Sequence, residues 1–195
     1  MRVAVTALLW LSASFVSAQA NLWDTVGREP AYPRVQSPSL SPRQLRGIGS
    51  LLRRNSPGGW PCSAQEMDAL IHDLRYEELS VSPSKQVVLA EAGPGCARGG
   101  QGSNGAMWLI QLNGNSPILL AGPSGKFSGW LYAVQPATSH GYRDIVLGWH
   151  MSAVDADLNY FRFDGTRYRS IGTAAIHWND DGGNGTITAG AAWPG

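Results

Sequence analysis

The chain has 195 residues, with 15 Lys and Arg against 14 Asp and Glu, and its formal net charge at pH 7 is +1. This length suits one domain with an ordered core. The near-neutral balance excludes the strong positive field that attracts polyanions, so we expect no nucleic-acid partner.

The first twenty residues have the features of a secretory signal peptide. A cation at Arg2 precedes an apolar run over residues 3–16, and Ala18, Gln19 and Ala20 form a small-x-small cleavage site. The apolar run is too short for a membrane span. We therefore expect a periplasmic or extracellular protein without a membrane span after cleavage; the alternative is an uncleaved N-terminal anchor.

Residues 21–40 are expected to form an extended arm or linker, because they carry prolines at 30, 33 and 38 and show no hydrophobic periodicity. A single disulfide-linked domain is expected to follow over residues 41–175. The last segment, residues 176–195, is rich in glycine and loses strand-like alternation except at 185–189. It is expected to add an edge strand or to fray.

Two short helices are predicted at the start of the domain. Ser41 is a good N-cap and Pro42 a good first helical residue, and apolar residues follow at helical spacing through Arg54. This helix has several cations and no acid, which indicates either a surface for anionic lipid or polysaccharide or, as we prefer, a solvated face. The second helix spans residues 63–74 and begins with a capping box from Ser63 to Glu66.

Strand patterns separated by turn residues fill the rest of the domain. Their consecutive order and tight turns predict an α+β fold: an antiparallel meander of about eight strands, an open barrel or curled sheet, preceded by the two helices. The expected strands are 75–81, 86–91, 106–112, 117–121, 126–135, 142–150, 158–164 and 167–174.

The clearest strand pattern lies between His140 and Tyr168. Two apolar runs with strand alternation flank a polar turn, which predicts a β-hairpin. Asp164 and Gly165 then predict a tight two-residue turn in which both residues take positive backbone angles.

The two cysteines predict a disulfide. Cys62 and Cys96 are an even pair in a chain expected to be exported, where thiols oxidise. A catalytic thiol is the alternative, but no histidine lies near either cysteine in the sequence.

The glycine-rich segment 93–105 is the best candidate for a binding site. Glycines let the backbone approach a ligand closely, and backbone N–H groups of such a loop can face an anion. The alternative is a long surface loop tethered by Cys96. The predicted ligand-binding residues are Arg98, Gln101, Ser103 and Asn104.

No hydrolase or phosphate-binding motif is complete in this sequence. The pattern Gly-x-Ser-x-Gly fails at Ser103, because position 101 is Gln, and the phosphate-binding loop fails because Phe127 follows Lys126. Asp144 and His150 share one face of a predicted strand but lie about 20 Å apart along it, too far to ligate one metal. No catalytic residue, metal or cofactor is therefore predicted.

One stretch carries a resemblance. The runs 139–147 and 158–168 resemble a pattern met in secreted bacterial β-rich domains of no assigned activity, and less closely the Gly-x-x-Asp blades of repeat propellers, of which only one copy is present. The resemblance rests on structural turns and implies no catalytic residues.

The function predicted from the sequence is a secreted or periplasmic, non-enzymatic binding module. Its expected partner is an envelope protein or glycan, with inhibition of an envelope enzyme as one form of that role. The alternative is a hydrolase or metal-dependent enzyme that uses the glycine-rich loop with Asp144 and His150.

Overall fold

The computed structural model describes residues 38–55, 62–98, 104–179 and 185–194. The expected signal peptide and most of the expected arm lie outside these residues, and so do Gln101 and Ser103. Two helices come first, α2 (Pro42–Asn55) and α3 (Ala64–His72). Neither of these described helices is long and apolar enough to cross a membrane.

In the described part of the chain, ten strands form two antiparallel sheets. The first sheet has the order β1-β2-β3-β4, with β5 also paired to β3, and the second has the order β10-β9-β8-β7-β6. The predicted α+β meander with a curled sheet is therefore confirmed, with its strands divided between two layers. The strands are β1 (Arg75–Glu78), β2 (Gln86–Glu91), β3 (Gly105–Leu112), β4 (Ile118–Ala121), β5 (Ser128–Gly129), β6 (Leu131–Ser139), β7 (Tyr142–His150), β8 (Asp155–Phe163), β9 (Tyr168–Trp178) and β10 (Gly185–Ala189).

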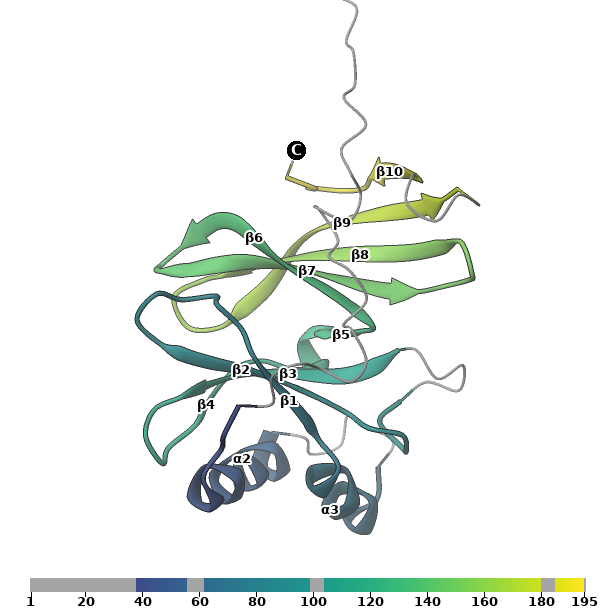
Figure 1. Ribbon diagram of the computed structural model, residues 1–195. Coiled ribbons are helices and arrows are strands. Elements are labelled where there is room, and N and C mark those ends of the chain that lie inside the picture. Colours follow the sequence, from purple (N-terminus) through teal and green to yellow (C-terminus); the bar gives the residue numbers. More distant parts are fainter. Residues whose placement is uncertain (1–37, 56–61, 99–103, 180–184, 195) are drawn as a thin grey trace, which may run out of the picture.

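The layers follow the order helices, first sheet, second sheet (Figure 1). Apolar residues of α2 and α3, including Ile48 and Leu52, pack with one face of the first sheet. The other face meets the second sheet in a core that includes Phe127 and Phe161, whose rings lie edge to face at 5.1 Å. A third cluster, with Tyr160 and Trp178, covers the far face of the second sheet.

Both predicted helix starts are confirmed. At α2 the Ser41 hydroxyl accepts a hydrogen bond from the Gln44 amide, and at α3 the capping box between Ser63 and Glu66 is complete. The arginines of α2 all lie exposed, opposite its buried side, and Arg53 pairs with Asp68 at 2.7 Å. They are Arg43, Arg46, Arg53 and Arg54.

The strand predicted over residues 126–135 is wrong, because the chain changes sheets within it. β5 pairs with β3 in the first sheet, whereas β6 pairs with β7 in the second. The crossing passes so close to β7 that a Cβ at Gly129 would lie 2.4 Å from the carbonyl oxygen of Gly148. Only glycine fits at this crossing. The alternation of the sequence is continuous here and gave no sign of the crossing.

The turn between β8 and β9 also differs from the prediction. The positive φ occurs at Gly165, at 101°, and not at Asp164. Asp164 instead uses its carboxylate to accept hydrogen bonds from the amides of Thr166 and Arg167, both at 2.8 Å. This is an Asx turn, which fixes the backbone through the side chain. At the far end of β9, residues 185–189 do add the edge strand β10, one of the two outcomes expected for the tail.

The predicted disulfide is confirmed. Cys62 and Cys96 are bonded, and the bridge joins the segment before α3 to the loop after β2. Both sulfurs pack against the core between the helices and the first sheet. The bridge therefore holds the helical layer to the sheet.

Replacement of both cysteines by serine is expected to lower the free energy of unfolding by about 2–4 kcal/mol, because the unfolded chain regains the entropy of a 34-residue loop. Urea denaturation of the oxidised wild type, the reduced wild type and the double variant measures this. The reduced protein and the variant should agree, and unchanged stability in both would contradict a structural role for the bridge.

Candidate functional site

A cavity of about 420 Å³ lies where the two sheets meet beside the turn between β8 and β9. This volume is in the range of sites for small organic ligands. One wall comes from β4 and the 3-10 helix η1 (Pro123–Gly125), the other from the start of β9, and the end of α2 contributes the remaining residue. The lining residues are Asn55, Leu119, Leu120, Ala121, Gly122, Ser124, Gly125, Lys126, Arg167, Tyr168, Arg169 and Ser170.

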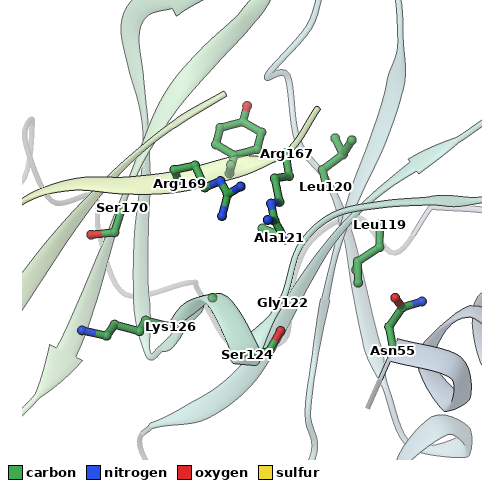
Figure 2. Close-up of a pocket in the computed structure, with 12 residues that line it drawn as sticks. Asn55, Leu119, Leu120, Ala121, Gly122, Ser124, Lys126, Arg167, Arg169 and Ser170 are labelled. Atoms are coloured by element: carbon green, nitrogen blue, oxygen red, sulfur yellow. The ribbon is translucent and has the colours of Figure 1, made fainter. Parts of the chain in front are cut away.

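The cavity is cationic. Three of its lining residues, Lys126, Arg167 and Arg169, carry positive charge, and none of the lining residues is acidic. Figure 2 shows the side chains of Arg169, in β9, and of Arg167, just before it, pointing toward the turn that carries Ser124, whereas the Lys126 side chain extends away from both arginines. Hydroxyl and amide groups from Ser124, Ser170 and Asn55 complete the polar lining, and buried apolar residues of β4 form the floor.

The two arginines flank a buried residue at the start of β9. Tyr168 is buried in the core between the sheets, whereas Arg167 before it and Arg169 after it are exposed. The Tyr168 hydroxyl donates a hydrogen bond to the carbonyl oxygen of Arg143 at 2.7 Å. Burial raises the pKa of this phenol, so the group is a protonated donor at neutral pH.

Lys126 is held by the turn after β4. It takes a left-handed backbone conformation with φ of 64°, and its amide donates to the carbonyl oxygen of Pro123 at 2.9 Å. The next residue, Phe127, is fully buried in the core between the sheets. The anchored phenyl ring fixes the backbone, and the lysine side chain is left exposed at the cavity.

Asp164 orders the arginine side of the cavity. Its Oδ2 accepts a hydrogen bond from Nε of Arg169 at 2.9 Å. Hydrogen bonds from the Arg167 amide first, and then from Arg169 and the Thr166 amide, hold the pKa of the Asp164 carboxyl far below its ordinary value. Arg169 is therefore partly neutralised and oriented.

The other two cations, Lys126 and Arg167, differ from Arg169 in their partners. Among the residues that the structure describes, no carboxylate pairs with Lys126 or with the Arg167 guanidinium. Three cations and the Asp164 carboxylate leave the cavity and its rim with a net charge of +2. An anionic group is the ligand that this arrangement favours.

The Asp164→Asn variant is expected to lose stability relative to wild type in a pH-dependent way. Because folding lowers the pKa of Asp164, its contribution is complete above the unfolded value near 3.9 and is lost as pH falls toward the folded value. Denaturant midpoints of the two proteins should thus converge between about pH 5 and pH 2. A difference that stayed constant over this interval would contradict the argument.

The glycine-rich loop candidates are placed only in part. Arg98 is four-fifths buried; its Nη1 donates to the carbonyl oxygen of Ala92 at 3.3 Å and lies 4.0 Å from Oε1 of Glu91. Asn104 makes two hydrogen bonds of 2.8 Å to the backbone of His150, one as donor and one as acceptor. These contacts hold the glycine-rich segment to the rest of the domain. Ligand binding by Arg98 and Asn104 stays a prediction, as it does for Gln101 and Ser103.

The residues of the enzyme alternative are engaged separately. Asp144 is fully buried and pairs with Arg162 at 2.7 Å. The His150 ring packs edge to face on Trp130 with centroids 5.2 Å apart. At the other end of β8, Asp155 lies between Ser152, at 2.6 Å, and His177, at 2.8 Å. With the carboxylate in the middle, the histidine does not accept the serine proton, so this arrangement lacks the geometry of a catalytic triad.

Comparison of the chain with protein-family models, curated proteins and solved structures found no match. Within the described part of the chain, no three His, Cys, Asp or Glu side chains are grouped closely enough to hold a metal ion.

Sequence reasoning did not find the cationic cavity. Lys126 and Arg167 are separated by 40 residues, and only the packing of β4 against β9 brings their segments together. The available signals were weak: an incomplete phosphate-loop pattern ending at Lys126, and two arginines spaced by one residue after the Asp164 turn. Neither signal indicates which sheet each segment joins.

Proposed function

We propose that this chain is an exported, non-enzymatic binding module, and that the cationic cavity between its sheets holds an anionic group of an envelope glycan. One observation carries the proposal: a cavity of ligand size is lined by three cations and by no acid. Guanidinium and ammonium groups make their strongest hydrogen bonds with anionic oxygens.

The disulfide supports export, because such bonds persist in oxidising compartments. A non-enzymatic role is supported by the separate structural engagement of Asp144 and His150, which the enzyme alternative needs together. The lining of the cavity supplies donors and cations but no histidine, carboxylate or cysteine to serve as a general base or strong nucleophile.

A glycan array with neutral, carboxylated, sulfated and phosphorylated members tests the proposal. Wild-type protein should bind anionic members only. The Lys126→Asn/Arg167→Gln variant should lose that binding, whereas the exposed pair Lys85→Asn/Arg43→Gln should retain it. Equal binding of neutral members, or no binding to any member, would contradict the proposal. Mass spectrometry of a bound glycan after incubation should find it unchanged, and cleavage or another modification would support an enzyme.

A further inference from the structure

The charge of the cavity narrows the ligand class further. Lys126 and Arg167 line the cavity, and neither has a carboxylate partner among the described residues, whereas Arg169 pairs with Asp164. The resulting net charge of +2 exceeds what a single carboxylate or a phosphodiester neutralises. A phosphate monoester, with a charge of about −1.5 to −2 at pH 7, matches it.

The shape of the cavity indicates what the phosphate is attached to. Its volume of about 420 Å³ leaves room for an organic group beside the anion. That part of the lining combines hydroxyl and amide groups, Ser124, Ser170 and Asn55, with apolar surface from Leu119 and Leu120. A hydroxylated ring offers hydrogen bonds to the first set and a C–H face to the second.

We propose that the ligand carries a terminal phosphate monoester on a sugar ring, with the phosphate on the cationic side of the cavity and the ring over its β4 side. This inference rests on the proposed function, because it uses the same cavity. A phosphorylated glycan and a phosphorylated sugar headgroup of a lipid share this chemistry.

Calorimetric titration at low ionic strength tests the inference with defined probes. Glucose 6-phosphate is expected to bind about tenfold more tightly than glucuronate, which has one charge, and more tightly than inorganic phosphate, which lacks the ring. Glucose should not bind measurably. Equal affinity for glucuronate and glucose 6-phosphate would overturn the inference while leaving the proposed function intact. Failure of every anion to bind would overturn both.

The pH dependence supplies a second readout. The second ionisation of a phosphate monoester has a pKa near 6, so affinity for glucose 6-phosphate should rise by about tenfold from pH 5 to pH 7.5. The charged groups at the cavity are Lys126, Arg167, Arg169 and, on its rim, Asp164. His140 lies near Gly165 of the same turn, where a Cβ at position 165 would be 3.7 Å from its ring. An affinity that stays flat or falls over this interval would overturn the inference.

A comparison of lipid-bound and free ligand distinguishes the two sources of the sugar phosphate. Vesicles containing a lipid with a phosphorylated sugar headgroup are compared with the same glycan in free form, at equal phosphate concentration. Stronger retention by vesicles assigns the lipid source, and equal affinity assigns a soluble glycan. Absence of binding to both, with glucose 6-phosphate bound, would overturn the placement of a larger saccharide at the cavity.

Discussion

Replacement of Arg162 by methionine is expected to lower the free energy of unfolding by about 3–5 kcal/mol, because it leaves the Asp144 carboxylate buried without its partner. Arg162 donates from Nε at 3.0 Å and from Nη2 at 2.7 Å to the same oxygen of Asp144. The hydrogen bond to Asp144 raises the pKa of Arg162. Removal of the guanidinium therefore leaves a charge with neither water nor a counterion.

The neighbours of this pair strengthen the expectation. Tyr160 lies on the same face of β8, and burial, followed by the charge of Asp144, raises the pKa of its phenol. Trp193 from the C-terminal segment packs edge to face on Tyr160 with centroids 5.6 Å apart. The Asp144 carboxylate itself is fully buried.

Urea denaturation with a constant m-value measures the effect. The double variant Asp144→Leu/Arg162→Met should recover most of the loss, because it removes both charges and supplies apolar volume. Arg169→Met, which breaks an exposed pair, should cost much less. A loss at Arg162→Met no larger than that at Arg169→Met would contradict the account of a buried pair.

The second large effect is expected on binding. The Lys126→Asn/Arg167→Gln variant should bind glucose 6-phosphate on the order of 100-fold more weakly than wild type, since each charge-assisted hydrogen bond contributes about 1.5 kcal/mol or more. Asparagine tolerates the left-handed backbone of residue 126, so the loss of charge is separated from strain. Both side chains are exposed, and stability should be unchanged.

Calorimetry at two salt concentrations measures this loss. Wild-type affinity should fall as salt rises, because the charges are exposed to solvent, and the variant should show little salt dependence. The Lys85→Asn/Arg43→Gln control removes one lysine and one arginine charge away from the cavity. Lys85 lies in the turn before β2. Arg43 is about 18 Å along α2 from Asn55, the residue of that helix that lines the cavity. Equal loss in control and test variants would show that net charge, and not the cavity, determines binding.

Much of the fold was predictable because local signals agreed with the tertiary structure. The capping box at Ser63 begins α3, and the alternation over residues 142–150 matches β7 at both ends. The predicted strand 126–135 was wrong because an apolar alternating run does not show that the chain leaves one sheet and joins the other. That change depends on how closely Gly129 approaches Gly148, a tertiary contact.

The disulfide could be predicted although its two cysteines are 34 residues apart, because composition and compartment indicate it and two cysteines allow one pairing. The cavity could not be predicted in this way. The cavity joins residues from α2, the turn after β4 and the start of β9, and its charge arises from their meeting. The glycine-rich segment was predicted to bind a ligand because of its unusual composition. In the structure, Arg98 and Asn104 of this segment make hydrogen bonds within the protein.

Amide chemical-shift mapping by NMR tests most directly whether the cavity between the sheets is the binding site. Titration of the wild-type protein with glucose 6-phosphate should shift the amides of residues 122, 124–126 and 166–170 in parallel, with saturation, and the Lys126→Asn/Arg167→Gln variant should show no such shifts. Saturable shifts confined to the flanks of the glycine-rich loop at 96–98 and 104–106, with the cavity residues unmoved, would contradict the account.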